Sequence, residues 1–249
     1  MTTRRDGSFS AGRAGVLLAI AATALATGCA RGLLERAIAA RGGALSSLSR
    51  VVEAEVHAGF PGRWQWRFDY RVPDQLRWTL DTYGEEQSFA FDGRAVSFYL
   101  GSARVAAAPP AVEDFRSHVR WIAVTTLDVL AIADDLVVRD LEPGELPAEV
   151  VAGLLATYRD DGARYALYFD EADLLVAAEG PIVLPTIAAG KMSASYSQFR
   201  NAAGYLLPYH GSYTLDGQPF FDETVLRYVP NDPLLTPESF RGPPPRAPR

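Results

Sequence analysis

The stretch RWQWRFDYRV, residues 63–72, decides the fold. Its large apolar side chains, among them Trp64, Trp66 and Phe68, stand at every second position, with arginine, glutamine and aspartate between them. Successive side chains of a strand point to opposite faces of a sheet. A period of two sustained over this stretch therefore predicts a β-strand with one buried face.

Similar alternation extends to both sides of this stretch. Before it, Val52, Ala54 and Val56 alternate with polar residues, and further short alternating segments follow it. Tight turns join these segments, such as Asp92-Gly93, a dipeptide typical of β-hairpins. The pattern predicts an antiparallel meander with a total of about ten or eleven strands.

Three segments show helical spacing instead. Residues 31–41 end at a Gly-Gly pair, residues 112–119 follow a Pro-Pro pair, and residues 127–131 form a third. Residues 180–190 are apolar without a clear period and are expected to form a loop. Together these elements predict an α+β domain, in which a strongly curved antiparallel sheet, an incomplete β-barrel, has short helices plugging its concave face.

Composition narrows the class of protein. The 249 residues are 48% hydrophobic and 22% charged, with a net charge of −6. These values fit a globular domain and exclude collagen-like, low-complexity and wholly disordered chains. A single cysteine cannot form an internal disulfide, and no cluster of Cys and His could hold structural zinc. No basic block follows the first residues, so nucleic acid is not expected as a partner.

The N-terminus has the features of an export signal. Arg4, Arg5 and Arg13 precede an uncharged stretch at residues 14–26 that is rich in Ala and Leu. This stretch suits a signal-peptide core and is shorter than the roughly 20 residues that a spanning helix needs. We therefore expect the leader to be removed.

The only cysteine follows this stretch directly. The sequence LATGC, ending at Cys29, resembles a bacterial lipobox. The resemblance implies that Cys29 becomes the first residue of the mature protein and carries an acyl-glyceryl group and a further chain such as palmitate. The alternative is a free thiol in a discarded leader. Ala30 after the cysteine implies an outer-membrane anchor facing the periplasm. The expected parts are a signal peptide at 1–28, a lipidated N-terminus with the first helix at 29–49, a half-barrel domain at 50–241 and a disordered tail at 242–249.

The first half of the chain is rich in aromatic residues on the expected apolar strand faces. Such a face is either a filled core or the wall of an apolar hollow that suits an acyl chain. On the second reading the lining residues from the strands are Trp64, Trp66, Phe68, Trp78, Leu80, Phe89, Phe91 and Phe98, and those from the helices are Phe115, Val119, Ile122, Leu127 and Leu130.

Several motifs, in order, resemble the LolA-like lipoprotein-sorting superfamily. They are PDQLRW (73–78), FDGR (91–94), VSFY (96–99), residues 196–199, GYLLP (204–208) and NDPLL (231–235). The resemblance implies an incomplete barrel with a helical lid that holds the acyl chains of lipoproteins or other lipids. With its expected anchor the protein is more similar to LolB, which is a lipoprotein, than to LolA, which is a soluble carrier. Residues 180–189 are the candidate for the protruding apolar loop of LolB.

The function that follows is passive capture and transfer of acyl chains by a membrane-anchored periplasmic protein. Its partners would be a lipid or acylated lipoprotein, the membrane through its anchor, and an envelope protein. The alternative is a non-catalytic envelope sensor or interaction module with a filled core.

Residues that could support catalysis are not arranged for it. Ser117 and His118 are neighbours on an expected helix, so their side chains point about 100° apart and cannot act on each other. A solvated or capping role is expected for them. Glu53, Glu55 and His57 share one strand face and could bind a metal, but an exposed polar edge is the more common arrangement. We expect no enzyme, no metal and no cofactor beyond the modification at Cys29.

Overall fold

The computed structural model describes residues 30–82, 85–106, 109–184 and 188–243. The expected signal peptide, Cys29 and the last six residues of the expected tail lie outside the described residues. Among the described residues, no helix combines the length and the apolar character needed to cross a membrane.

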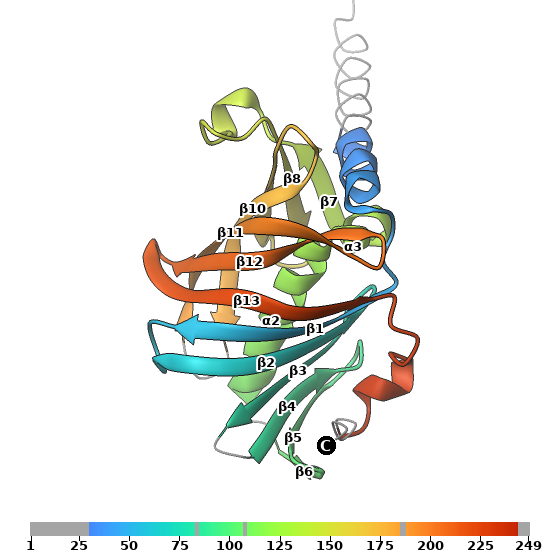
Figure 1. Ribbon diagram of the computed structural model, residues 1–249, viewed down its shortest axis with the longest axis vertical. Helices are drawn as coiled ribbons and strands as arrows, with labels where there is room; N and C mark the ends of the chain where they lie inside the picture. Colours follow the sequence, from blue (N-terminus) through green and yellow to red (C-terminus); the bar gives the residue numbers. More distant parts are fainter. Residues whose placement is uncertain (1–29, 83–84, 107–108, 185–187, 244–249) are drawn as a thin grey trace, which may run out of the picture.

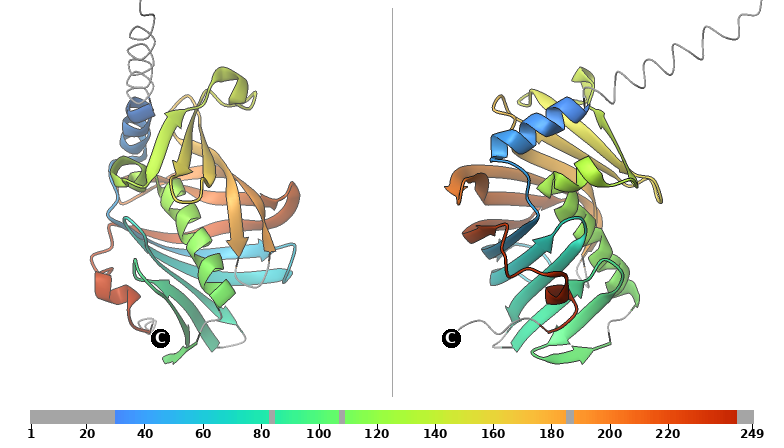
Figure 2. Two further views of the ribbon diagram at one scale, coloured as in Figure 1. Left: turned by 180° about the vertical axis from the view of Figure 1, so that it is seen from behind. Right: turned by 90° about the vertical axis from the view of Figure 1, so that its right-hand side faces the viewer.

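Thirteen strands of the described chain form one antiparallel sheet (Figure 1). They are β1 (Ser47–Val56), β2 (Gly62–Arg71), β3 (Gln75–Thr82), β4 (Glu85–Phe91), β5 (Val96–Leu100), β6 (Ala103–Val105), β7 (Leu136–Asp140), β8 (Ala152–Tyr158), β9 (Arg164–Phe169), β10 (Leu175–Leu184), β11 (Ala188–Ala202), β12 (Tyr205–Leu215) and β13 (Gln218–Pro230). Their spatial order is β6-β5-β4-β3-β2-β1-β13-β12-β11-β10-β9-β8-β7. The sheet is strongly curved and open, which confirms the expected fold class (Figure 2).

The first and last strands pair at the centre of this sheet. Val52 of β1 lies opposite Val225 of β13, and β1 pairs with β2 on its other side. Two halves therefore spread from the centre, one made of β2 to β6 and the other of β12 back to β7.

A long helix connects the two edges of the sheet. Helix α2 (Pro109–Thr126) follows edge strand β6, continues into the short helix α3 (Asp128–Ile132) and leads to the opposite edge strand, β7. It lies across the concave face (Figure 2). Its residues Phe115, Val119 and Ile122 are all buried, as their helical spacing predicts. Single-turn 3-10 helices are η1 (Pro143–Glu145) and η2 (Pro237–Phe240).

A second helix, described over residues 30–41 and called the N-terminal helix here, lies beside β7 (Figure 1). Its residues Leu33, Leu34 and Ala37 are buried. The helix ends at Gly42, whose φ is +113° and where a Cβ would stand 2.4 Å from the carbonyl oxygen of Gly204. Only glycine fits this close approach, which fixes the end of the helix against the β11–β12 turn.

Two sequence expectations need correction. The sheet has thirteen strands rather than ten or eleven, partly because β6 is three exposed residues long and carries no apolar pattern. The expected loop at 180–190 is largely strand, since β10 runs to Leu184 and β11 begins at Ala188. Inward-facing Gly180 makes room for the ring of Tyr165, and this glycine hid the alternation that continues to buried Ile182. The part of 180–189 that is described is therefore not a protruding loop.

Candidate functional site

The concave face of β2 to β5 contacts α2 through a cluster of stacked rings. The rings of Phe68 and Trp78 stack at 6.0 Å, and His118 of α2 stacks on both, at 5.7 and 5.4 Å. Phe89 extends this cluster by stacking on Phe98 at 4.6 Å and on the fully buried Phe115 at 5.5 Å. The protein's own rings therefore occupy much of the concave side of these strands, and Phe89 and Phe98 at the edge of the cluster stay half-buried.

His118 is buried in this cluster, contrary to the expected solvated or capping role. Its side chain is 8% exposed, and neither ring nitrogen has a hydrogen-bond partner. Burial, and after it the charge of Arg50, lowers the pKa of His118 to about 3. The imidazole is consequently neutral near pH 7 and packs against the neighbouring rings as an aromatic side chain.

The other half of the concave face keeps a cavity of about 100 Å³. It lies between the central strands, the C-terminal end of α2 and the N-terminal helix. The apolar and aromatic residues that line it are Ala37, Leu45, Leu48, Phe68, Tyr70, Trp121, Ile122, Leu127, Leu174, Leu175, Tyr196, Phe199, Leu206, Leu207, Pro208, Tyr213 and Tyr228, and the polar ones are Arg41, Arg50, Thr125 and Thr126. Ligand sites commonly measure about 300–1,000 Å³, so this conformation has room for only part of an acyl chain.

The predicted lining residues divide among three places. Phe68, Ile122 and Leu127 line the cavity. Phe91 and Val119 line a separate surface groove. The others lie in the packed aromatic half, in the rest of the core or at its edge, and are Trp64, Trp66, Trp78, Leu80, Phe89, Phe98, Phe115 and Leu130. Stacked rings surround Trp78, Phe89, Phe98 and Phe115 within this last group, and for its eight members the role in lining a hollow stays a prediction.

Sequence reasoning missed a buried ion pair in the cavity wall. Arg50 Nη1 donates to Glu223 Oε1 at 2.8 Å, and their side chains are only 15% and 4% exposed. The Tyr213 hydroxyl donates to the same oxygen at 2.7 Å. The signal was present, because Arg50 continues the register of the buried residues Val52 and Ala54 on β1. A charge on an otherwise apolar strand face indicates a polar site inside.

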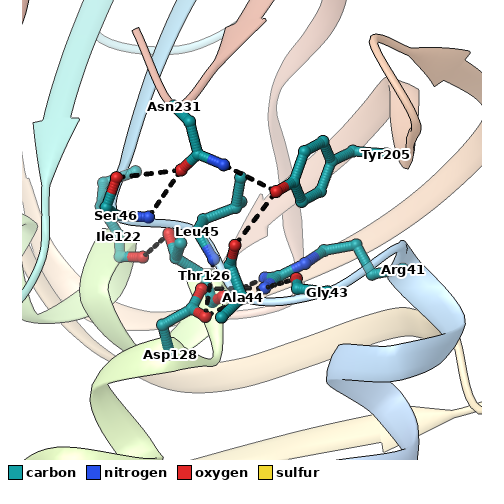
Figure 3. A network of polar contacts seen from close by, with 10 residues as sticks. All are labelled: Arg41, Gly43, Ala44, Leu45, Ser46, Ile122, Thr126, Asp128, Tyr205 and Asn231. Atoms are coloured by element: carbon teal, nitrogen blue, oxygen red, sulfur yellow. Dashed lines mark hydrogen bonds and ion pairs between the residues drawn. The ribbon is translucent and has the colours of Figure 1, made fainter. Parts of the chain in front are cut away.

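A second buried ion pair fastens the N-terminal helix (Figure 3). Arg41 Nη2 lies 2.9 Å from Asp128 Oδ2, and the two side chains are 9% and 7% exposed. Arg41 also donates to the carbonyl oxygens of Thr126 and Gly43. Asp128 accepts a further hydrogen bond from the backbone N–H of Leu45, at 2.9 Å. The end of the N-terminal helix is therefore held to the α2–α3 junction.

The segment after that helix is held from the opposite side (Figure 3). Asn231, at the end of β13, accepts from the backbone N–H of Ser46 at 2.7 Å and donates to the Tyr205 hydroxyl at 2.6 Å. That hydroxyl donates to the Ala44 carbonyl at 3.1 Å. Together with the Arg41 contacts, these bonds fix the connection between the cavity roof and the first strand.

A larger groove of about 770 Å³ lies beside α2, between that helix, α3 and residues of β4 and β8 to β10. It combines apolar residues such as Phe91 with the charged residues Glu113 and Arg116. Arg120 bridges Asp160 and Asp161 of the β8–β9 turn, at 2.5 Å from each. This mixed, charged lining is less suited to an acyl chain than the cavity is.

The residues considered for catalysis do not form a reactive group. His57 Nε2 lies 2.8 Å from Asp222 Oδ2, and both side chains are more than a third exposed. Ser117 Oγ accepts a hydrogen bond from the backbone of Val183, while its neighbour His118 lies in the aromatic cluster. Within the described parts of the chain, no three His, Cys, Asp or Glu side chains gather as metal ligands would.

The curved open sheet, its crossing helix and the cavity under a helical roof define a half-barrel of the LolA type. No family model and no curated protein matches the sequence. A LolA superfamily protein from Nitrosomonas europaea matches with a TM-score of 0.55 and 13% identity, over 85% of this chain and 96% of its own. A putative outer membrane lipoprotein-sorting protein domain from Vibrio parahaemolyticus gives 0.54 and 12%, over 85% and 97%. A DUF1329 family protein from Desulfovibrio piger gives 0.55 and 10%, over 85% and 96%.

These likenesses establish the fold. The chain has a LolA-like fold, as its motifs led us to expect, at an identity that leaves function to be argued from the site. None of the three proteins is described as an enzyme.

Proposed function

We propose that this protein binds lipid in the cell envelope, capturing the acyl chain of a lipid or of an acylated protein without catalysis. The observation that carries the proposal is the largely apolar cavity on the concave face, roofed by the N-terminal helix. The LolA-like fold, shared with a protein described as an outer membrane lipoprotein-sorting domain, supports it. Release to a partner would need only a difference in affinity between the two binders.

The proposal includes an opening step, because about 100 Å³ does not hold a whole acyl chain. The N-terminal helix is the element we expect to move. Its outer contact is an exposed ion pair, Arg36 with Asp173 at 2.9 Å, while Leu33 and Leu34 form its buried apolar face. Because the Arg41–Asp128 ion pair holds the C-terminal end of this helix, we expect its N-terminal part, with Leu33 and Leu34, to swing outward while the sheet stays intact.

We also propose that acylated Cys29 anchors the protein to the outer membrane. The chain is already helical and buried at Ala30, the residue after the cysteine, so the anchor would adjoin the cavity roof directly. Stable anchoring needs more than one acyl chain. Cys29→Ser should move the protein from the membrane to the soluble fraction, and unchanged membrane association would contradict the anchor.

The second candidate is an envelope interaction module with a filled core. The packed rings beneath β2 to β5 and the small cavity favour it, and the open groove beside α2 would be its contact surface. The two functions differ in one observable property, which is whether the purified protein takes up lipid.

The deciding experiment uses the chain from Ala30 onward, which keeps every described residue. We expect native mass spectrometry to detect bound lipid, and a fluorescent acyl probe to bind with saturation. Leu48→Trp, in the cavity wall on β1, should lower probe affinity by about tenfold because the indole fills the space. Leu226→Trp on neighbouring β13 is the matched control, since Leu226 is 51% exposed. A lipid-free mass together with no probe uptake would favour the interaction module.

A further inference from the structure

The groove beside α2 follows that helix over several turns. Its lining residues on α2 include Glu113, Arg116, Arg120 and Ala123, whose spacings of three and four place them along one face. At a rise of 1.5 Å per residue this face is about 15 Å long. Helix α3 extends the groove, and α2 lies in front of the sheet in the left view of Figure 2. A groove of this length matches the way proteins receive a helical segment of a partner.

The floor of the groove is apolar. Val119 and Ala123 of α2 and Tyr165 of β9 line it, and all three are buried. The wall on β10 is held to α2, because Ser117 Oγ accepts a hydrogen bond from the backbone N–H of Val183 at 3.0 Å. On α3, Ile132 also lines the groove but is 59% exposed. This exposed side chain offers a contact to an apolar group from outside the chain.

The charged residues of the groove are mostly acidic. Its described lining holds two arginines, Arg116 and Arg120, and five carboxylates, which are Asp74, Glu113, Asp135, Asp160 and Asp161. With all seven ionised, the net charge of this lining is −3. Arg116 pairs with Glu113 at 2.9 Å, and the two aspartates of the β8–β9 turn share Arg120. The internal ion pairs therefore leave negative charge over.

Two of the carboxylates have no cation. In the described chain, no ion pair includes Asp74 or Asp135. Burial raises the pKa of half-buried Asp74, and the negative charges of Asp135 and Asp92 raise it further. A positive charge brought into the groove would relieve this repulsion, whereas an anion would add to it.

We propose that the groove beside α2 binds a basic amphipathic segment of a partner protein, with its apolar side chains on the floor and its lysines or arginines against Asp74, Asp135 and the β8–β9 turn. The inference rests on the contact surface of the second candidate function and adds the chemistry of the partner. It holds whether or not the cavity takes up lipid. Because the charges are complementary, attraction also speeds the encounter.

The test uses three fluorescein-labelled synthetic peptides of about 14 residues, which form about four helical turns. All three have leucines at helical spacing, and the other positions are lysine, glutamine or glutamate. Fluorescence anisotropy measures their binding to the chain from Ala30 onward. We expect the lysine peptide to bind best, the glutamate peptide not to bind, and the affinity of the lysine peptide to fall about tenfold between about 0.05 and 0.3 M salt. Equal binding of the lysine and glutamine peptides would overturn the proposal.

Charge variants locate the binding site. The double variant Asp74→Asn with Asp135→Asn should lower the affinity for the lysine peptide about tenfold. The double variant Glu53→Gln with Glu55→Gln is the matched control, since it removes two charges from exposed positions of β1. Equal losses in the two would show only a general attraction to an acidic protein and would overturn the groove assignment. If the first variant does not fold, Asp135→Lys at an exposed position decides, with Glu55→Lys as its control.

Further measurements separate the other possible occupants. Ile132→Ser should weaken lysine-peptide binding about threefold, and Leu226→Ser, also at a position more than half exposed, should not. Equal effects would contradict the apolar contact. Displacement of the peptide by an equal concentration of spermine would assign the groove to a small cation. A dimer in sedimentation that Asp135→Lys dissociates would assign it to a second copy, and either result overturns the proposal. Uptake of the fluorescent acyl probe by the same preparations reports separately on lipid binding.

Discussion

The two halves of the sheet face the same helix but differ in what lies between. Beneath β2 to β5, tryptophan and phenylalanine rings stack on one another and on His118. Beneath β11 to β13, leucines and tyrosines surround a buried ion pair and leave a cavity. Flat rings fill space efficiently when they stack. An aromatic-rich strand face therefore predicts core, and a buried charge on an apolar face is the better indicator of a binding cavity.

The largest expected effect tests whether the aromatic half is packed core. Phe115 is fully buried and stacks on Phe89 and His118. Phe115→Ala should lower the free energy of unfolding by about 3–5 kcal/mol, because it removes apolar contacts and leaves a void. Urea unfolding measures this, with exposed Leu226→Ala as the control. A loss below about 1 kcal/mol would mean that the rings enclose free space, as the sequence first suggested.

The next effect concerns the charged half. Arg50→Met leaves Glu223 buried without its cation and should cost about 3 kcal/mol of stability. The double variant Arg50→Met with Glu223→Gln removes both charges and should recover to within about 1 kcal/mol of the wild type. A double-mutant cycle in urea gives the coupling. If the losses of stability in the two single variants simply add in the double variant, Arg50 and Glu223 do not stabilise each other, and the contrast between the two halves of the sheet is weaker.

Local sequence patterns predicted the fold well where they were uninterrupted. The alternation in β2 and the spacing of Phe115 and Val119 gave the curved sheet and its crossing helix. The pattern failed at Gly180, where a glycine makes room for the ring of Tyr165. A glycine at an inward-facing position interrupts the alternation of apolar side chains, so the sequence pattern no longer indicates a strand.

The site was less predictable because its partners are far apart in the chain. Arg50 and Glu223 are separated by 173 positions, and Arg41 and Asp128 by 87. No local spacing relates such residues, although Arg50 alone was visible as a charge on an apolar face. The expected role of His118 was wrong because the rings that surround it, Phe68 and Trp78, come from strands far away in the sequence. The lipidation of Cys29 stays a prediction.

A smaller loss of stability is expected when the pH is lowered, because His118 lies in the aromatic half. The pKa of His118 in the folded protein is about 3, below the ordinary value of about 6.5. Between these values the unfolded chain binds a proton that the folded chain does not. Stability is therefore full above pH 6.5 and falls as the pH drops. The loss attributable to His118 should be about 2–3 kcal/mol between pH 6.5 and 4.5.

His118→Phe isolates this contribution, because it keeps a stacked ring and removes the titrating group. Urea unfolding of wild type and variant at both pH values gives the difference, and the carboxylates common to the two proteins cancel. We expect the variant to lose less stability on acidification by the amount above. Equal losses would place His118 in contact with water, which would mean that the aromatic half is not tightly packed.

The smallest effect on stability is expected at the roof of the other half. Arg36 pairs with Asp173, and its side chain is 60% exposed. The pKa of Arg36 is raised by its hydrogen bond to Asp173 and by the charge of that carboxylate, but exposed pairs of this kind contribute little to folding. Arg36→Ala should therefore leave the urea midpoint unchanged.

Its effect on lipid uptake should be larger than its effect on stability. If the N-terminal helix must move for a ligand to enter, losing its outer ion pair lowers the barrier to that movement, and stopped-flow loading of a fluorescent ester becomes faster at equal affinity. Glu35→Ala is the control, because the ion pair of Glu35 with Arg31 lies within the same helix. Unchanged loading in Arg36→Ala, with normal binding at equilibrium, would show that the ligand enters by another route.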